Sequence, residues 1–410
     1  MPRQLRICIV TPGPLRSNPR VAKEAQALHD AGYDVTVVST RTLVDPRDDA
    51  ILASAGWRSI RLDIHARGTG WRLRRVAQFG HVVAFRLTNW KGLAGRAFSP
   101  FAGPLAATAQ GVLADFYIAH YPAALPAAAI AARRHGALYA FDAEDFHLGE
   151  WSEEPRYDSK RRLVHAIERR YLLGCAHVTA ASPGIADAYV AAYGIVRPTV
   201  VLNVFPLAQG PSEPTSAGTV VPGPSVYWFS QTIGPDRGLQ CAVRAMSRAR
   251  TRPHLYLRGS PVPGFIAQLR ILAAELGITD RLHILSPAAP STMGCLAARY
   301  DVGLVSETGH TLGRRIALTN KQFTYILAGV PAVMSDIPAH RTFALEVGQA
   351  VRLYPVDDAD GLAAALDGLL GDPVALAAAR TAAFRMGQSR FNWDIHKGNL
   401  LESLSTSLMA

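Results

Sequence analysis

The sequence has few cysteines and shows no pattern in their spacing. Its 410 residues include Cys8, Cys175, Cys241 and Cys295, and no two of them form a C-x-x-C pair. We therefore expect neither a disulfide framework nor a cysteine zinc site, and we predict a reducing, cytoplasmic location.

Long apolar runs are also missing. The most apolar stretch, PAALPAAAIAA from Pro122, is rich in alanine, is interrupted by Pro126 and is too short to cross a bilayer. The N-terminus, MPRQLRICIVTPG, passes directly into a strand-like segment and lacks the long apolar segment and small-residue cleavage site of a signal peptide. We expect neither a transmembrane span nor a signal peptide.

Acidic residues are fewer than basic residues. The chain has 43 Lys and Arg against 32 Asp and Glu, which gives a net charge of +11. The first half carries most of this excess, because residues 1–205 hold 25 basic and 17 acidic residues, against 18 and 15 in residues 206–410. The excess predicts an acidic partner for the first half: nucleic acid, an anionic membrane or a phosphorylated substrate.

Short β-branched runs alternate with segments of helical periodicity, which is typical of α/β proteins with parallel sheets. The first such unit begins with a strand at residues 5–10. Asn18 is placed to cap the following helix, with Pro19 at its first position, and Gly32 is placed to end it. A chain that is 49% apolar and 18% charged has enough apolar residues for two cores of about 200 residues each.

A change in composition divides the chain. Residues 206–224 are rich in proline, glycine and serine and have no periodicity, so we predict an interdomain linker there. The expected domains are residues 1–205 and 225–388, followed by a terminal helical segment at 389–410.

Polar residues gather where strands of the first domain end. The loop T-P-G-P around Gly13 has one of the three glycines of a dinucleotide motif, so NAD binding is not expected, although Gly13 can bring backbone close to a ligand. His120 follows one predicted strand, and a second strand runs into three carboxylates. Imidazole and carboxylates at strand ends suit the binding of sugar hydroxyls, and we predict an acceptor side at Asp142, Glu144 and Asp145.

The second domain opens with a strand that runs into a polar loop. Gln231, Thr232 and Gly234 lie in this loop, and Arg237-Gly238 introduces a helix. Backbone donors, a helix N-terminus and a fixed positive charge together predict a diphosphate site. The competing interpretation is a capped helix with a solvated arginine.

A second polar segment follows a later strand of this domain. Glu307 ends that strand, Asn320 can cap the next helix, and the helix carries Lys321, one of only five lysines in the chain. The carboxylate can hold sugar hydroxyls and the lysine can hold phosphate; alternatively, Lys321 pairs with a nearby acid. No His/Cys cluster with ligand spacing occurs, so we expect no metal and no cofactor.

Four segments together carry a resemblance. RICIVTPGPLRSNPRVAKEAQALHDAGYDVTVVS looks like the opening unit of the family-4 retaining glycosyltransferases with the GT-B fold. AHYPAALPAAAIAARRHGALYAFDAEDF is similar to their H-D-x-x-x-L-P…Y-D-A-H-E/D stretch, and KQFTYILAGVPAVMSDIPAHR to their K-L-F-E-Y-M-A-A-G-L-P-V-V-A-S-D. FNWDIHKGNLLESL resembles their tryptophan-bearing terminal helix.

This resemblance implies an α/β protein of GT-B architecture. Two Rossmann-like domains would face each other across a cleft, and the terminal helix would return to the first domain. The implied reaction moves a sugar, with retention, from a nucleoside diphosphate to a glycan or lipid-linked acceptor in cell-surface polysaccharide or glycolipid synthesis. With the residues singled out above, the predicted catalytic set is His120, Arg237, Lys321 and Glu307, and the predicted donor-binding set is Gly13, Gln231, Thr232, Gly234, Leu285, Asn320 and Thr324.

The sequence departs from the family pattern at several positions, among them Glu144 in place of a histidine and Gln231 or Thr232 in place of an arginine. Many members carry two glutamates eight residues apart before A-x-G, and here Ile316 and Thr324 occupy those positions while Glu307 lies in a longer loop. Two other classes therefore stay open: a non-hydrolysing epimerase acting on UDP-sugars, and a non-catalytic GT-B scaffold subunit.

The basic excess of the first domain is concentrated in residues 57–98. This stretch holds nine Arg and Lys and one acid, interleaved with aromatic residues. Arginine beside tryptophan suits the headgroup zone of an anionic bilayer, and we predict membrane-surface contacts by Trp71, Arg72, Arg74 and Arg75. A solvated helix pair is the alternative, and nucleic acid is not expected because no recognisable nucleic-acid module accompanies the charge.

Overall fold

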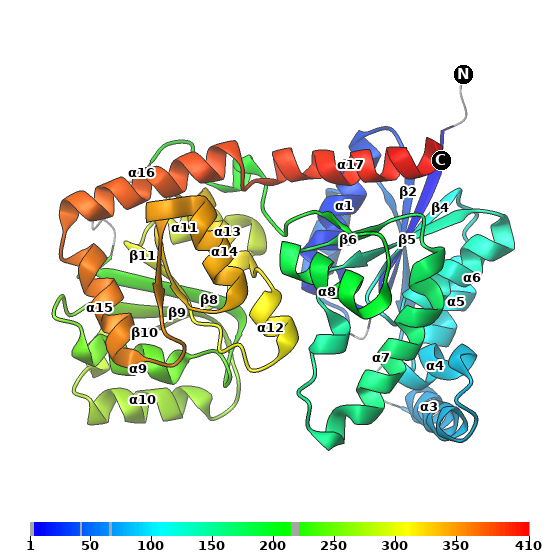
Figure 1. Cartoon of the computed structure of the whole chain (residues 1–410), viewed down its shortest axis with the longest axis horizontal. Helices are drawn as coiled ribbons and strands as arrows, with labels where there is room; N and C mark the ends of the chain where they lie inside the picture. The colour runs from blue at the N-terminus through cyan, green and yellow to red at the C-terminus, as the bar shows by residue number, and fades with distance from the viewer. Residues whose placement is uncertain (1–3, 42, 65–67, 215–220, 410) are drawn as a thin grey trace. The chain divides into compact units, whose positions relative to one another are not determined.

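The computed structural model describes residues 4–41, 43–64, 68–214 and 221–409. The chain forms two compact units (Figure 1). Unit 1 comprises Met1–Val201, Thr311–Gly313 and Lys397–Ala410, and unit 2 comprises Leu202–His310 and Arg314–His396.

Unit 1 is built on a parallel sheet with the strand order β3-β2-β1-β4-β5-β6-β7. Its strands are β1 (Arg6–Val10), β2 (Asp34–Arg41), β3 (Arg58–Asp63), β4 (Phe116–His120), β5 (Leu138–Ala143), β6 (Val178–Ala180) and β7 (Thr199–Val200). Its helices are α1 (Pro19–Asp30), α2 (Pro46–Ala53), α3 (Thr69–Thr88), α4 (Ala94–Phe98), α5 (Ala102–Gln110), α6 (Leu125–His135), α7 (Asp158–Tyr171) and α8 (Pro183–Tyr193).

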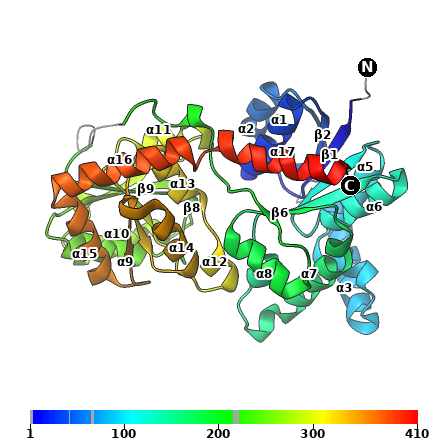
Figure 2. The same ribbon diagram turned by 45° about the horizontal axis from the view of Figure 1, so that its top comes forward.

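The predicted start of α1 is confirmed. The Asn18 side chain accepts a hydrogen bond from the backbone N–H of Val21, and Pro19 is the first helical residue, where it needs no hydrogen-bond donor. The buried side of α1 then packs against β1, and the terminal helix α17 (Trp393–Met409) contributes Leu404 to the same core. Figure 2 shows α17 beside α1.

Strand β3 lies at one edge of this sheet and is charged. Arg58 pairs with Asp34 at 2.8 Å and Arg61 pairs with Asp49 at 2.7 Å. Asp63 accepts a bond of 2.5 Å from Arg41. The edge strand therefore presents paired charged side chains beside the partly exposed Ile60.

Unit 2 repeats the architecture with the parallel order β10-β9-β8-β11-β12-β13. Its strands are β8 (Ser225–Ile233), β9 (His254–Pro261), β10 (Leu282–Leu285), β11 (Val302–Val305), β12 (Ala332–Ser335) and β13 (Val351–Tyr354). Its helices are α9 (Leu239–Arg248), α10 (Phe265–Glu275), α11 (Met293–Ala297), α13 (Asn320–Leu327), α14 (Pro338–Val347), α15 (Ala359–Leu370) and α16 (Pro373–Ser389), while α12 (Leu312–Ile316) contains the change from one unit to the other.

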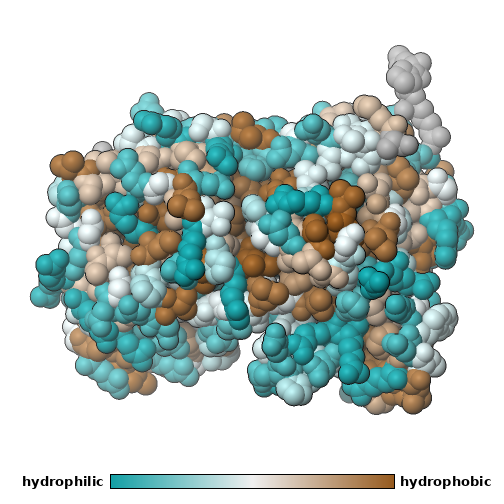
Figure 3. Space-filling model, in the orientation of Figure 1, coloured by the Kyte–Doolittle hydropathy of each residue, from teal (hydrophilic) through white to brown (hydrophobic). Residues whose placement is uncertain are grey.

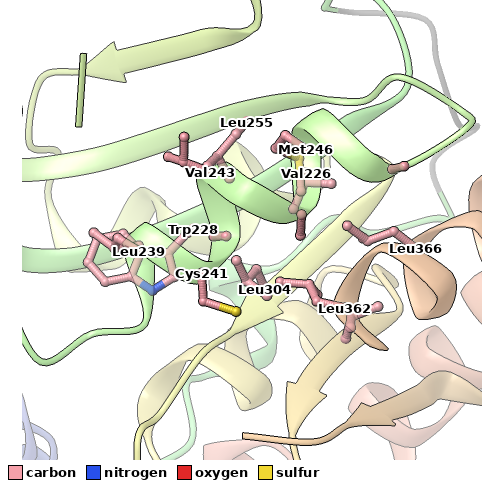
Figure 4. Close-up of a cluster of buried hydrophobic side chains, with 14 of the residues drawn as sticks. Val226, Trp228, Leu239, Cys241, Val243, Met246, Leu255, Leu304, Leu362 and Leu366 are labelled. Atoms are coloured by element: carbon pink, nitrogen blue, oxygen red, sulfur yellow. The ribbon is translucent and has the colours of Figure 1, made fainter. Parts of the chain in front are cut away.

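The core of unit 2 lies between the sheet and the helices α9, α10 and α15. Trp228 of β8, Leu239 and Cys241 of α9 and Leu362 of α15 meet there (Figure 4). All four are at most 2% exposed, so the start of α9 is fixed to the sheet by close packing.

The stretch predicted as a linker, residues 206–224, packs on unit 2 in its described parts. Gly210 lies against Leu327, and the Cys295 Sγ is 3.8 Å from the carbonyl oxygen of Gln209. The Tyr256 hydroxyl donates to the carbonyl of Pro222 at 3.2 Å. Residues 215–220 lie outside the described residues. The change of unit falls at Val201–Leu202, before the predicted linker, because Leu202 and the residues after it contact unit 2.

The predicted α/β class, with two parallel sheets and Rossmann-like strand orders, is confirmed. One local prediction is wrong: Thr319, not Asn320, is the N-cap of α13, and its hydroxyl donates to the side-chain oxygen of Gln322 at 2.9 Å. Within the described chain, no single helix is apolar and long enough to span a membrane, and one sharply bent pair, 359–370 with 373–409, meets the criteria by length and composition alone.

Candidate active site

Each sheet has one place where the strand order reverses direction. In unit 1 it lies between β1 and β4, and in unit 2 between β8 and β11. Ligands of open parallel sheets bind outside the carboxyl ends of the strands at such a switch point. Gly13 and His120 lie at the switch point of unit 1, and Arg237 and Glu307 at that of unit 2.

His120 is the centre of a buried cluster in unit 1. Its Nε2 is 2.5 Å from Glu24 Oε2, and its Nδ1 is 2.9 Å from Glu144 Oε1 and 3.3 Å from Asp142 Oδ2. The imidazole is fully buried. Both ring nitrogens are therefore occupied by carboxylates, which holds the ring in one orientation and keeps it away from solvent.

Arg20 and Asn18 complete this His120 cluster. The Arg20 guanidinium donates two hydrogen bonds to Asp142, at 2.5 and 2.8 Å, and a third to the Val201 carbonyl. Asn18 donates to Glu144 at 2.7 Å. Because Asn18 also caps α1, the cluster ties the start of that helix to the ends of β4 and β5.

The opposite charges of the His120 cluster stabilise one another's ionised forms. Burial alone would lower the pKa of His120, but the carboxylates of Glu24 and Asp142 and the hydrogen bond to Glu144 raise it to about 10. Burial would raise the pKa of Asp142, but the positive charges of Arg20 and His120 lower it to about 2. The cluster therefore holds a buried imidazolium between carboxylates.

Glu24, His120 and Asp142 also place three potential metal-ligand atoms within 4.8 Å of one another. Asp142 is already bound by Arg20 through both oxygens, and His120 is bound by carboxylates through both nitrogens. A divalent ion would displace these bonds and stand beside the Arg20 charge. The donor set therefore suits an internal ion-pair network better than a metal.

Two further predicted residues of unit 1 lie near this cluster. Gly13 is half-buried, and a Cβ added there would meet only Ser17 Oγ at 3.6 Å, an ordinary contact. Asp145 is half-buried, and its carbonyl accepts a bond of 3.4 Å from the Tyr189 hydroxyl. The sugar-binding roles of both residues stay predictions.

Glu307 is the centre of a second cluster, in unit 2. Its Oε1 accepts a bond of 2.8 Å from Lys321 Nζ, and its Oε2 is 3.7 Å from Arg314. Glu307 and Lys321 are 4% and 5% exposed, and Lys321 Nζ lies 5.7 Å from the centre of the Trp228 ring. The predicted alternative, that Lys321 pairs with a nearby acid, describes this contact.

Three cations surround the one carboxylate. Burial would raise the pKa of Glu307, but Lys321, Arg314 and Arg237 lower it to about 2. Arg237 is half-buried, and its guanidinium has no hydrogen-bond or ion-pair partner among the described residues. The Glu307 cluster, defined as Glu307, Lys321, Arg314 and Arg237, therefore carries an excess of positive charge.

The loop before α9 brings backbone close to this cluster. Gly238 is the N-cap of α9 with a φ of +67°, and a Cβ there would lie 2.6 Å from the carbonyl oxygen of Ser306. The Ser306 hydroxyl in turn donates to the Arg237 carbonyl at 2.6 Å. Only glycine fits this approach, which places the amino end of α9 beside the loop that carries Glu307.

The remaining predicted donor residues lie in different environments. Gln231 and Thr232 are exposed at the irregular end of β8, and Gly234 is buried against Val262. Leu285 ends the edge strand β10. The Thr324 hydroxyl donates to the Asn320 carbonyl at 2.9 Å inside α13, and Thr324 is 1% exposed. The Thr324 hydroxyl is therefore already bonded within the helix, and its donor contact stays a prediction.

Helix α3 holds the predicted membrane-surface residues, but they point in different directions. Arg72 and Arg75 are exposed. Trp71 packs toward Phe101 at 5.9 Å, and one terminal nitrogen of Arg74 is buried, so these two turn toward the body of the unit. The exposed face instead carries a stripe of large apolar residues, each between 39% and 81% exposed: Leu73, Val76, Phe79, Val83 and Leu87.

This α3 stripe has basic neighbours. Arg72, Arg75 and Arg86 are exposed on the same helix, and Trp90 is exposed just beyond its end. Figure 3 shows hydrophobic and hydrophilic surface meeting at the corner of unit 1 where Figure 1 draws α3. The face combines apolar and cationic side chains without a covering element among the described residues.

The strand orders and switch points define the class of protein, and comparison with known proteins agrees. Over almost its whole length the chain has the fold of Anabaena HepE solved with UDP-glucose, with a TM-score of 0.73, 15% identity and coverage of 98% of this chain and 100% of that one. Sucrose-phosphate synthase from Thermosynechococcus elongatus gives a TM-score of 0.73 at 16% identity, covering 99% and 100%. The chain has the GT-B fold of glycosyltransferases.

The sequence comparison is more specific for unit 1. Residues 17–204 match the glycosyl transferase 4-like domain. A segment of 79 residues, 19% of this chain, is 40% identical to the phosphatidyl-myo-inositol mannosyltransferase of Mycolicibacterium smegmatis. The match spans about a fifth of that mannosyltransferase (20%). The predicted resemblance to family-4 GT-B glycosyltransferases is confirmed.

Sequence reasoning missed several residues of these clusters. Glu24 and Arg20 lie 96 and 122 positions from their partners His120 and Asp142, and no local spacing signals such pairs. Arg314 had a weak signal, since it lies in the basic loop after Glu307. The apolar steps of three and four residues from Leu73 to Leu87 were visible, but periodicity does not tell an exposed face from a buried one.

Proposed function

We propose that this chain moves a sugar from a nucleoside diphosphate to a glycan or lipid-linked acceptor, with retention of configuration. The observation that carries the proposal is the Arg237 guanidinium at the amino end of α9, beside Lys321 and Arg314. A helix N-terminus and several cations at a switch point suit a diphosphate. The UDP-glucose complex of HepE, which has the same fold, supports a nucleotide sugar as donor.

The reaction needs negative charge to be stabilised on the leaving group. The bond between the sugar C1 and the diphosphate oxygen breaks, and the acceptor hydroxyl oxygen forms a new bond to C1 on the same face. The leaving phosphate takes the proton of that hydroxyl. Arg237, Lys321 and the N–H groups of the α9 loop would hold the departing diphosphate, which lowers the barrier by several kcal/mol.

In this proposal Glu307 orients the cations and does not act as a base. Its carboxylate holds Lys321 at 2.8 Å, and its lowered pKa keeps it ionised at neutral pH. The fixed cations would replace a metal ion at the diphosphate. We therefore expect that turnover persists in excess EDTA and does not rise with added Mg²⁺; loss of turnover on chelation would contradict a metal-free site.

Donor binding is the sharpest test of the proposal. A thermal-shift panel of UDP, GDP and ADP should show stabilisation by one base, and calorimetry should show that Arg237→Ala weakens binding of that nucleotide. Nucleotide-sugar turnover then follows, with Arg237→Ala and Lys321→Ala as variants. Unchanged turnover in both variants would remove the proposed diphosphate site.

The same nucleotides and nucleotide sugars distinguish a glycosyltransferase from an epimerase and from a scaffold subunit. Incubation of the donor without any acceptor, followed by NMR, would reveal an epimerised sugar if the chain were a UDP-sugar epimerase. A scaffold subunit would bind none of the three nucleotides. A glycosyltransferase binds one of them and yields transferred sugar only when an acceptor is present.

We also propose that unit 1 attaches peripherally to an anionic membrane on its cytoplasmic side. The α3 stripe supplies apolar side chains for the interface, and the neighbouring arginines each contribute on the order of 1 kcal/mol near anionic headgroups. Attachment through this face would bring a lipid-linked acceptor to unit 1, and it fits a role in cell-surface polysaccharide or glycolipid synthesis. Sedimentation with anionic and with neutral vesicles tests this proposal.

A further inference from the structure

Tyr121 has an unusual backbone at the switch point of unit 1. It follows His120 directly at the carboxyl end of β4, and its φ is +67°. The other described non-glycine residues with positive φ are Asn89, Asp236, Arg252 and Asp357. Asparagine and aspartate tolerate this conformation, whereas a bulky aromatic residue there is strained, and such strain is concentrated at functional sites.

The Tyr121 ring contacts a neighbouring side chain, but its hydroxyl lacks a hydrogen-bond partner among the described residues. It is half-buried, and its ring centre lies 5.7 Å from that of His147. Its hydroxyl forms no hydrogen bond within the described parts of the chain. Burial first, and then the negative charges of Glu144 and Asp145, raise the pKa of the Tyr121 phenol well above its usual value. The phenol therefore stays protonated and remains a hydrogen-bond donor.

The surrounding charge indicates which kind of ligand this donor would meet. Asp142, Glu144, Asp145 and Glu150 all contribute negative potential at the phenol. That potential disfavours a phosphate, while the cations of the Glu307 cluster are all in unit 2. A neutral molecule with many hydroxyl groups fits the place, since an aromatic face packs against the C–H side of a sugar ring and an O–H bonds to its oxygens.

We propose that Tyr121 is a specificity-determining residue that contacts the sugar or polyol of the acceptor, donating its O–H to an acceptor oxygen and packing its ring on the acceptor. This inference rests on the proposed transfer reaction. His120 underneath has a different role, because it is fully buried and fixes the end of β4 from which Tyr121 projects. The strained backbone of Tyr121 fixes the direction in which its ring leaves the end of β4, toward His147.

The experiment compares three variants of the full chain. Tyr121→Phe removes only the hydroxyl, and Tyr121→Gly removes the side chain and relieves the strained φ. Tyr33→Phe is the matched control. Tyr33 is half-buried and precedes β2, so it lies at the amino ends of the parallel strands, whereas Tyr121 lies at their carboxyl ends. Binding of the methyl glycosides of glucose, galactose, mannose and N-acetylglucosamine, and of myo-inositol, is measured by saturation-transfer NMR, and transfer kinetics follow with those that bind.

We expect Tyr121→Phe to weaken binding of the preferred sugar, and to raise its KM, by about three- to tenfold, the effect of one lost hydrogen bond. The nucleoside diphosphate affinity of Tyr121→Phe should match that of the wild type. Tyr33→Phe should match the wild type in sugar binding and in KM. Tyr121→Gly should lose sugar binding while its Tm equals or exceeds that of the wild type, whereas a merely structural tyrosine would lower the Tm and leave sugar binding intact.

The failures of the two proposals are distinguishable. Wild-type transfer with an unchanged acceptor KM in Tyr121→Phe and Tyr121→Gly overturns the assignment of Tyr121 alone, as does a wild type that binds none of the five probes. Absence of both nucleoside diphosphate binding and donor cleavage in the wild type overturns the proposed transfer reaction instead.

Discussion

Lys321 Nζ lies 2.8 Å from Glu307 Oε1, and both side chains are almost completely buried. Lysine and glutamate thus form an ion pair that joins helix α13 to the segment after β11. A buried pair is costly to break from one side, because the remaining charge is left in a poor environment. The pair therefore contributes both to the folding stability of the site and to its electrostatic potential.

Removing one partner of this pair should destabilise unit 2. We expect Lys321→Ala to lower the free energy of unfolding by about 3–5 kcal/mol, because Glu307 is left buried without its closest cation. The double variant Lys321→Met/Glu307→Gln should recover most of that loss. Urea unfolding measures both, and a double variant as unstable as the single one would show that the charges do not act as a pair.

Arg237 should matter for the ligand and little for stability. Its half-buried guanidinium has no ion-pair partner among the described residues, so Arg237→Ala should change the Tm by no more than about 3 °C. Calorimetry should show nucleoside diphosphate affinity reduced about tenfold, as for loss of a charge-assisted hydrogen bond. Arg244→Ala, exposed on the same helix α9, is the control and should bind normally.

His120 should make stability fall as the pH rises above neutrality. Its folded pKa of about 10 lies above its ordinary 6.5 because neighbouring carboxylates outweigh burial. The stabilisation is therefore complete below pH 6.5 and is lost as the pH rises toward 10, with a slope of up to about 1.4 kcal/mol per pH unit. Chemical unfolding between pH 6.5 and 10 measures the slope.

Two histidine variants decide whether His120 is the source. His120→Gln should reduce the slope. The slope that remains belongs to His147, because its hydrogen bond to Glu150 outweighs burial and raises the pKa of His147 to about 9. His340→Gln should keep it, because burial lowers the pKa of His340 to about 4 and that ring stays neutral across the range. Equal slopes in the wild type and in His120→Gln would contradict the assignment.

The approach of Gly238 to Ser306 should be intolerant of a methyl group. Gly238→Ala places a Cβ 2.6 Å from a backbone carbonyl in addition to the cost of a positive φ. Gly264→Ala has a φ of +80° and open space around the new Cβ, so it measures the backbone cost alone. We expect the Tm to fall further in Gly238→Ala, together with nucleoside diphosphate affinity; equal losses would show that the loop can shift.

Membrane attachment should depend on the α3 stripe and on anionic lipid. The protein should sediment with vesicles of phosphatidylglycerol and phosphatidylcholine and much less with phosphatidylcholine alone. Leu73→Glu/Leu87→Glu should abolish sedimentation, because charge is placed in the apolar face. Val196→Glu, at a position 91% exposed elsewhere in unit 1, is the control and should still sediment. Unaltered sedimentation of the α3 variant would place the interface elsewhere.

Local signals predicted much of the fold. Asn18 and Pro19 marked the start of α1 because capping depends on neighbouring residues alone, and Gly238 marked the start of α9 for the same reason. The N-cap of α13 was assigned one residue too late, since Thr319 and Asn320 are both good caps and sequence does not choose between them.

The site was less predictable because its contacts are long-range. His120 was found by its position after a strand, but its partners Glu24 and Asp142 become neighbours only when α1 and β5 meet β4. The composition of α3 indicated a basic, aromatic surface. The side of the helix that faces solvent is set by the contact of Trp71 with Phe101 and by the hydrogen bond from Gln78 to the Phe98 carbonyl, which turn Trp71 inward and leave the apolar stripe outward.

Strand β3 has a consequence for the behaviour of the molecule in concentrated solution. An open sheet edge offers unpaired peptide groups to any other extended chain. Here Arg58, Arg61 and Asp63 of the outermost strand form ion pairs with residues of β2 and α2, and a second polypeptide docking along the strand would have to strip those charges of water. The charged side chains of β3 thus oppose edge-to-edge polymerisation of this unit.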